Sequence, residues 1–152
     1  MFEIEFLGTG TSTGVPQIGC GCEVCRSGDS RDHRLRTSAI IRPNGKSILI
    51  DCGPDFRTQI LRSGSPEIDC LLLTHIHYDH VGGIDDLRQY TKNGALPVFA
   101  RADVINDLKA RLPRSGIPAG SLPRQSLIPT NADTVLDTAV SVVPKTEFRQ
   151  TF

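Results

Sequence analysis

The sequence predicts an α/β domain, because segments patterned like strands alternate with segments patterned like helices. In residues 69–73 (DCLLL) no polar side chains alternate with the apolar ones. This pattern is typical of a strand buried on both faces. Residues 102–112 carry apolar side chains at helical spacing. A chain of 152 residues is long enough for one such domain with a core and short for two.

The first strands are predicted near the start of the chain. Residues 2–7 (FEIEFL) alternate apolar and charged side chains, a pattern that favours a half-buried strand. Two further apolar segments, 38–42 and 47–51, flank the dipeptide Asn44-Gly45. Because this dipeptide favours a tight turn, the two segments are predicted to pair as a hairpin.

Helices and later strands follow in alternation. A short helix is expected after Pro54 and ends at Gly64, a second follows the histidine-rich segment, and the third spans 102–112. Residues 96–100 and, more weakly, 138–143 have the composition of strands. The apolar helix residues expected to face the core are Phe56, Ile60, Leu61, Ile84, Leu87, Val104, Ile105, Leu108 and Leu112.

Composition restricts the classes of function. Lys plus Arg and Asp plus Glu both number 17, so the formal net charge is zero, which argues against a general electrostatic role on nucleic acid or membrane. No apolar run approaches the roughly 18 residues of a membrane span, and we expect a cytoplasmic protein. Five cysteines, an odd number, suit metal binding better than a disulfide framework. Cys52 and Cys70 lie in apolar strand contexts and are predicted to be core residues.

Three of the four histidines lie within THIHYDH, directly after the buried strand. His75 and His77 are two residues apart, so in extended backbone their side chains point to the same side. Asp79 and His80 follow immediately. Imidazole nitrogens and carboxylate oxygens are the usual ligands of Zn²⁺, Mn²⁺ or Fe, and these four groups could serve two metals. The alternative is a polar surface loop that happens to be rich in histidine.

A second candidate metal site lies in the segment 8–36, which has no periodicity and is long for an unstructured loop in a small domain. Cys20, Cys22 and Cys25 have C-x-C-x-x-C spacing, a good partial Zn²⁺ site that lacks one ligand and would hold the loop together. His33 is the local candidate for that ligand. The alternative is that the three cysteines are reduced and bind no metal.

The glycine-rich segment GTGTSTG does not predict a dinucleotide site. The G-x-G-x-x-G fingerprint requires glycine where this chain has Thr13, and a proline and cysteines follow instead of a helix pattern. Its glycines are more simply explained if the backbone passes close to the metal centre.

THIHYDHVGG matches the HxHxDH signature of the metallo-β-lactamase-fold hydrolases. Together with FLGTGTSTGVPQIGCGCEVC, RTSAII and LIDCGPDFR, it makes the chain resemble the PhnP-like phosphodiesterase branch, which is related to tRNA 3′-processing nucleases. The resemblance implies the αββα sandwich of that fold, with an N-terminal half and an incomplete C-terminal half. Residues 1–112 would be the N-terminal part of the hydrolase domain, and residues 113–152 a truncated or poorly ordered continuation.

The resemblance also implies a dinuclear site. His75 and His77 would bind one divalent metal (Zn or Mn), and Asp79 and His80 the other. Asp79 would also be the catalytic residue that orients the attacking hydroxide. Asp51, at the end of the neighbouring strand, is expected to accept a hydrogen bond from a ligand imidazole, or else to be an ordinary turn aspartate.

The expected function is metal-dependent hydrolysis of small, including cyclic, phosphodiesters, with one structural zinc at the cysteine loop. One alternative is a catalytically impaired zinc-binding fragment, because the family takes further histidines and a bridging aspartate from its second half and this chain has no histidine after His80. Another is a hydrolase of a different ester or lactone on the same fold. The expected partner is a small phosphodiester rather than a membrane or nucleic acid, and homo-oligomers remain open.

Overall fold

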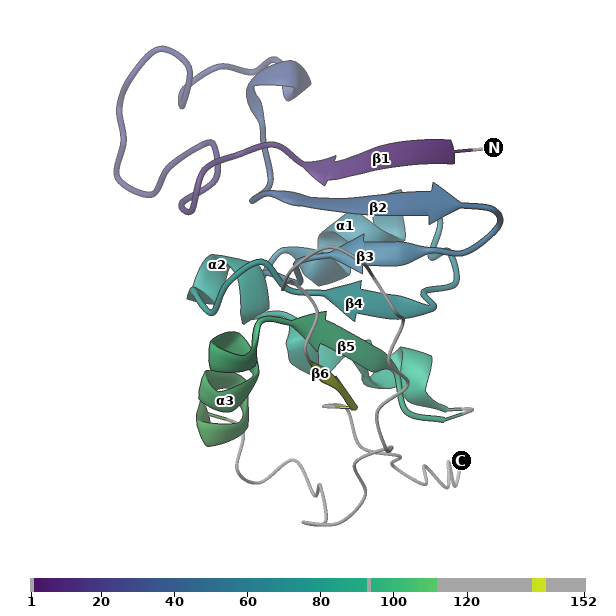
Figure 1. Cartoon of the computed structure of the whole chain (residues 1–152). Helices are drawn as coiled ribbons and strands as arrows, with labels where there is room; N and C mark the ends of the chain where they lie inside the picture. Colours follow the sequence, from purple (N-terminus) through teal and green to yellow (C-terminus); the bar gives the residue numbers. More distant parts are fainter. Residues whose placement is uncertain (1, 93, 112–137, 142–152) are drawn as a thin grey trace, which may run out of the picture.

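The computed structural model describes residues 2–92, 94–111 and 138–141 (Figure 1). The strands are β1 (Phe2–Gly8), β2 (Ser38–Pro43), β3 (Ile48–Ile50), β4 (Cys70–Leu72), β5 (Pro97–Ala100) and β6 (Thr138–Ser141). The α-helices are α1 (Phe56–Arg62), α2 (Tyr78–Val81) and α3 (Ala102–Arg111). Two 3-10 helices, η1 (Ser30–Asp32) and η2 (Ile84–Thr91), complete the described elements, none of which is a helix long and apolar enough to cross a membrane.

The six strands form one mixed sheet in the order β1-β2-β3-β4-β5-β6 (Figure 1). The pairs β1–β2, β2–β3 and β5–β6 are antiparallel, and β3–β4 and β4–β5 are parallel. The predicted hairpin between β2 and β3 is confirmed: Asn44 and Gly45 have φ values of 49° and 78°, as a turn with two left-handed residues requires. All six predicted strands are present.

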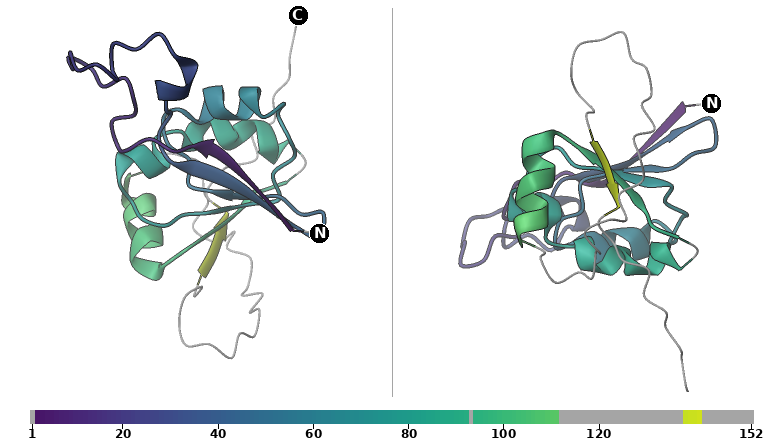
Figure 2. Two further views of the ribbon diagram at one scale, coloured as in Figure 1. Left: turned by 90° about the horizontal axis from the view of Figure 1, so that it is seen from above. Right: turned by 60° about the horizontal axis from the view of Figure 1, so that its bottom comes forward.

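One face of the sheet carries the core. Ile40, Leu49, Leu71 and Val98 are register partners on four successive strands and are fully buried. They belong to one apolar cluster with Phe56 and Ile60 of α1, Ile84 and Leu87 of η2, and Val104, Ile105 and Leu108 of α3. Figure 2 shows α1 and η2 on the same face of the sheet. Helices α2 and α3 lie at the end of the sheet where β4 and β5 finish (Figure 1), which is also where the histidine motif begins.

Three sequence-based predictions about this core need correction or completion. Leu61 was expected to face the core but is 55% exposed, because the short helix α1 contacts the sheet through Phe56 and Ile60. The helix expected around Ile84 and Leu87 is a 3-10 helix, although both side chains are buried as predicted. Leu112 lies outside the described residues.

The opposite face of the sheet is only partly covered within the described residues. On β4, Leu71 is buried whereas Cys70 and Leu72 are half-buried, so the strand is not buried on both faces as predicted. On β1, Phe2, Ile4 and Phe6 are 65%, 48% and 71% exposed. The predicted strand exists, but these three side chains are turned away from the core. The other face of β1 carries Glu3 and Glu5, which pair with Arg42 of β2, and Leu7, which is partly buried against the core.

Candidate metal centre

The histidine motif begins where β4 leaves the sheet. The Leu73 amide still donates to the Phe99 carbonyl at 2.8 Å, and the chain then turns out of the sheet. His77 has extended backbone (φ −64°, ψ 149°) and precedes α2, whose first turn carries Asp79 and His80. The motif is therefore split between an extended segment and a short helix.

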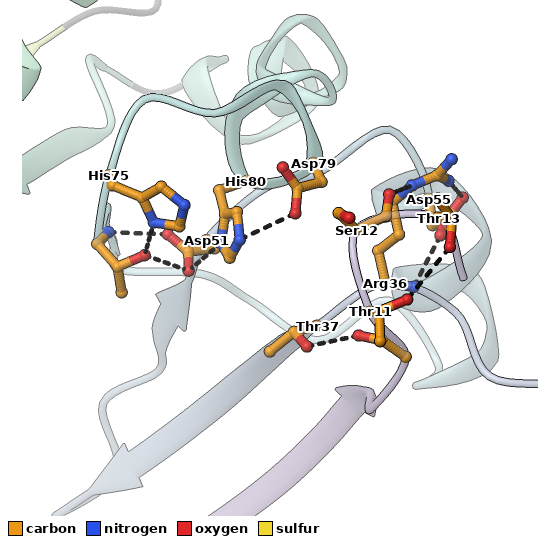
Figure 3. Close-up of polar contacts among 12 residues, drawn as sticks. Thr11, Ser12, Thr13, Arg36, Thr37, Asp51, Asp55, His75, Asp79 and His80 are labelled. Carbon is orange, nitrogen blue, oxygen red and sulfur yellow. Dashed lines mark hydrogen bonds and ion pairs between the residues drawn. The ribbon is translucent and has the colours of Figure 1, made fainter. Parts of the chain in front are cut away.

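The structure brings the predicted ligand side chains together. The ring centroid of His75 lies 4.7 Å from that of His77 and 3.9 Å from that of His80. The Nε2 atom of His80 lies 3.1 Å from Oδ2 of Asp79. Figure 3 shows His75, Asp79 and His80 grouped beside Asp51. The expected juxtaposition is thus present, whereas binding of metal to these residues stays a prediction.

Asp51 lies beneath the histidines and is 2% exposed. Its Oδ1 accepts the Thr74 amide at 2.8 Å, and its Oδ2 contacts the Thr74 hydroxyl and His80 Nδ1, both at 2.7 Å. The residue has a φ of 57°, a left-handed conformation that is uncommon outside glycine and typical of constrained functional positions. Asp51 therefore has the imidazole contact expected of a residue that orients a metal ligand.

The contact between His80 and Asp79 provides a test of whether these residues suit a cation. A neutral His80 that gives its Nδ1 proton to Asp51 has only a lone pair at Nε2. In this neutral form the lone pair faces the Asp79 carboxylate at 3.1 Å, so two acceptors stand opposite each other unless a proton or a metal ion lies between them. A divalent cation bound by both would satisfy them, and the donor set of imidazole and carboxylate suits Zn²⁺ or Mn²⁺.

The segment after β3 fixes α2 through backbone packing. A Cβ atom on Gly53 would lie 2.0 Å from the Asp79 carbonyl oxygen, and one on Gly83 would lie 2.1 Å from the Gly53 carbonyl oxygen. The Cys52 amide donates to the His80 carbonyl at 2.7 Å, and the Gly83 amide donates to the Cys52 carbonyl at 2.9 Å. Only glycine, which has no side chain, lets the backbone at Gly53 come this close to the backbone of α2 and Gly83. This close packing determines where Asp79 and His80 lie.

Sequence reasoning did not single out Thr74, Gly53 or Gly83. Their signal was their position beside the motifs, in THIH, IDCG and HVGG. Cys52 is fully buried as predicted, and burial raises the pKa of its thiol well above the ordinary value. Cys70, also predicted to be a core residue, is only half-buried.

The glycine-rich loop is fixed at a neighbouring position. Arg36 pairs with Asp55 at 2.8 Å and donates through Nε to the Ser12 carbonyl at 2.8 Å (Figure 3). The Thr37 hydroxyl donates to the Gly10 carbonyl at 2.8 Å. A Cβ atom on Gly10 would lie 2.7 Å from the Arg34 carbonyl oxygen. The close approach that requires this glycine is thus to the backbone that leads into β2. The expected passage of the loop beside the metal centre stays a prediction.

The cysteine loop forms the second candidate site. The sulfur atoms of Cys20, Cys22 and Cys25 all lie within 4.8 Å of one another, and among the described residues no other trio of histidine, cysteine or acidic ligand atoms is that close. Backbone amides point at two of the sulfurs: Gln17 N–H at Cys25 Sγ (3.3 Å) and Cys25 N–H at Cys22 Sγ (3.5 Å). The arrangement suits three thiolate ligands of a tetrahedral ion.

The three thiols influence one another's titration. The Cys25 amide, together with the neighbouring thiols, lowers the pKa of Cys22. At Cys25, the Gln17 amide acts to lower the pKa, but desolvation and the two neighbouring thiols outweigh it, so that the pKa of Cys25 is raised. His33 does not join the trio: its Nε2 contacts the Ser27 carbonyl oxygen at 3.3 Å, so it is not placed as the fourth ligand that we considered.

A chelator should loosen the cysteine loop and leave the sheet intact. If one zinc holds the three sulfurs, its removal takes away the cross-link that closes residues 8–36. We expect faster amide hydrogen exchange in that range after chelation, with little change in β3 and β4, which the core retains. Equal exchange before and after removal of a measured bound zinc would contradict a structural role.

Comparison with known proteins identifies the family. The sequence profile of the beta-lactamase superfamily domain matches residues 46–151. The chain belongs to the beta-lactamase superfamily.

Among solved structures of the superfamily, a diphosphatase from the PhnP family is 42% identical, with a TM-score of 0.69 over 74% of this chain and 47% of that one. Zn²⁺-bound PqqB from Methylobacterium extorquens is 27% identical, with a TM-score of 0.62 over 72% of this chain and 40% of that one. The predicted metallo-β-lactamase fold is confirmed, and so is the predicted resemblance to the PhnP-like branch, through the 42% identity to its diphosphatase.

Two curated relatives are matched over a smaller share of their own length than these two solved structures are. An octanoyltransferase of Porphyromonas gingivalis (strain ATCC BAA-308 / W83) is 55% identical over 107 residues, which cover 70% of this chain and 22% of that protein. A ribonuclease Z of Bradyrhizobium diazoefficiens is 40% identical over 89 residues, which cover 57% of this chain and 24% of that protein. This beta-lactamase superfamily chain thus spans less than half the length of these relatives. The expected boundary at residue 112 stays a prediction.

Proposed function

We propose that the chain carries the HxHxDH part of a dinuclear metal site that hydrolyses small phosphodiesters. The observation that carries the proposal is the buried carboxylate of Asp51, which contacts His80 and Thr74 directly below the ligand candidates. Packing of an apolar core gives no reason for a buried carboxylate, and this one also has a left-handed backbone. It suits the orientation of imidazoles toward a cation.

Each residue has a distinct role in this proposal. His75 and His77 bind one cation, and Asp79 with His80 binds the other. When bound, the cations supply a water activated at neutral pH and neutralise charge on the phosphoryl group. Asp79 has a second role as the catalytic residue, because a carboxylate at that position can hold the attacking water through a hydrogen bond. Asp51 keeps the His80 ring fixed so that Nε2 faces the site.

The substrate class rests on similarity. The PhnP-family neighbour is named a diphosphatase, and a second relative is named a ribonuclease Z, so both names refer to cleavage at phosphorus. The neutral overall charge of this chain favours a small phosphodiester over a long nucleic acid. Zinc is supported by the Zn²⁺-bound PqqB neighbour, and by the cysteine loop, for which we propose one structural zinc.

A specific observation favours a second candidate, a zinc-binding domain with impaired catalysis. Within the described residues, the histidine site offers two ligands to each cation, and the ligand atoms of its residues do not form a trio within 4.8 Å. A cation held by two ligands keeps several exchangeable waters and little geometric restraint. Hydrolysis of another ester or of a lactone on the same fold is a third candidate.

One experiment separates these candidates. An aryl phosphodiester, a thioester and a lactone are offered to the chain with Mn²⁺ or Zn²⁺, alone and after its residues 1–111 have been joined to the second half of a PhnP-family relative. We expect little phosphodiester hydrolysis by the chain alone and clear hydrolysis by the joined protein, with metal counted by elemental analysis. If the joined protein binds two cations at the histidine site and cleaves only the thioester or the lactone, the phosphodiester assignment is wrong. If it binds metal and cleaves nothing, the impaired-domain candidate stands.

A further inference from the structure

The hydroxyl of Thr74 lies between Asp51 and His75. It donates to Asp51 Oδ2 at 2.7 Å and lies 3.0 Å from Nδ1 of His75. Thr74 directly precedes His75 and follows the last residue that pairs with β5, so the side chain of His75 begins where the sheet ends. Figure 3 shows His75 and His80 on either side of Asp51, with the separate contact of His80 with Asp51.

Counting protons determines the direction of each bond. A hydroxyl has one proton to give, and an ionised carboxylate has none. The 2.7 Å contact with Asp51 therefore uses the Thr74 proton. The 3.0 Å contact with His75 then needs a proton from the imidazole, so Nδ1 of His75 must carry hydrogen. The reverse assignment would leave two acceptors, Thr74 Oγ1 and Asp51 Oδ2, facing each other at 2.7 Å without a proton.

We propose that Thr74 is a positioning residue. Its hydroxyl links Asp51 to His75 through two hydrogen bonds and thereby fixes the Nδ1–H tautomer of the His75 ring. His80 receives the same tautomer directly, since its Nδ1 contacts Asp51 at 2.7 Å. One buried carboxylate thereby sets both imidazoles so that Nε2, and not Nδ1, presents a lone pair. His75 and His80 belong to different cations in the proposed site, so Asp51 and Thr74 align both halves of it.

The hydroxyl and the backbone of Thr74 have separable roles. The Thr74 amide donates to Asp51 Oδ1 at 2.8 Å and is unaffected by side-chain substitution. Thr74→Val keeps the shape and the backbone bond and removes the hydroxyl, whereas Thr74→Ser keeps the hydroxyl. Because the Thr74 side chain is in part exposed to water, loss of its hydroxyl should change the tautomer of His75 more than it changes the stability of the fold.

The test uses the metal-free full chain with ¹⁵N-labelled histidine, at a pH where imidazole is neutral. Long-range ¹H–¹⁵N correlations report which ring nitrogen of His75 carries the proton, and His75→Gln assigns its signals. We expect Nδ1–H at His75 in the wild type and in Thr74→Val a shift toward Nε2–H. Thr74→Ser should restore the wild-type tautomer, and His80 should remain Nδ1–H in all three proteins as the internal control.

A zinc titration gives the second readout, and it alone rests on the proposed function. Thr74→Val should weaken zinc binding at the histidine site by roughly 10- to 100-fold, as loss of a residue that orients a ligand does. If the tautomer changes as expected but the wild type binds no zinc at this site, the inference about Thr74 holds and the proposed function fails. Nε2–H at His75 in the wild type overturns the inference even if the valine variant does not fold. An unchanged tautomer in folded Thr74→Val overturns it equally.

Discussion

Replacing His77 by alanine is expected to abolish phosphodiester hydrolysis in the joined protein and to weaken metal binding at the histidine site of the chain itself. His77 shares the proposed first cation with His75, whose ring lies 4.7 Å away, and its removal leaves one of the two ligands available in the described residues. The loss should exceed the roughly 10- to 100-fold that removal of an orienting partner costs, because a ligand itself is removed. Zinc titration with elemental analysis measures the binding, and an aryl phosphodiester assay measures turnover.

The matched control for this experiment is His33→Ala. His33 is an exposed histidine on the cysteine loop whose ring contacts the Ser27 carbonyl oxygen and lies outside the cysteine trio. Its substitution should leave both the histidine-site zinc and the cysteine-loop zinc unchanged. If His77→Ala binds zinc at the histidine site as tightly as His33→Ala does, the assignment of His77 as a ligand is wrong.

Replacing Gly53 by alanine should lower both the free energy of unfolding and the metal affinity of the histidine site. The added Cβ would lie 2.0 Å from the Asp79 carbonyl oxygen, a backbone atom that cannot move without displacing α2. Forcing an extra methyl into a packed site costs about 1–3 kcal/mol, and a backbone obstacle places this substitution at the upper end. Chemical denaturation gives the stability, and zinc titration gives the affinity.

Gly28→Ala provides the comparison for this substitution. Gly28 has open space within 4 Å of the position that its Cβ would occupy, and its φ is not among the left-handed values. The same chemical change should therefore be nearly neutral there. Gly83→Ala should repeat the Gly53 effect, because its Cβ would lie 2.1 Å from the Gly53 carbonyl oxygen. A Gly53→Ala protein as stable as Gly28→Ala would show that α2 adjusts freely, and that the two glycines do not position Asp79.

The sequence predicted features that depend on neighbours along the chain. The hairpin turn at Asn44-Gly45 follows from two residues that tolerate left-handed backbone, and the structure has both in that conformation. Grouping of the histidines follows from their spacing just after a strand, because few backbone paths separate side chains so near in sequence. Proximity of the three cysteine sulfurs is local in the same way.

Predictions failed where packing at a distance decides the outcome. Helical periodicity could not separate Leu61 from Ile60, because the angle at which α1 meets the sheet selects which of two adjacent residues is buried. Alternation in β1 indicated a strand with two unlike faces, and only the arrangement of the sheet shows that the apolar face, with Phe6, is the uncovered one.

The sequence by itself determined the type of candidate metal ligands, their local grouping and the order of strands and helices. Only the tertiary structure decided how those ligands are oriented. Parallel pairing of β3 with β4 sets Ile50 opposite Leu72, and so brings Asp51 to the same edge as Thr74, 23 positions further along the chain. No pattern within either segment encodes that register, because it results from burial of Leu49 and Leu71 side by side in one core. The buried carboxylate, the threonine hydroxyl and the two imidazoles meet as a consequence of that packing.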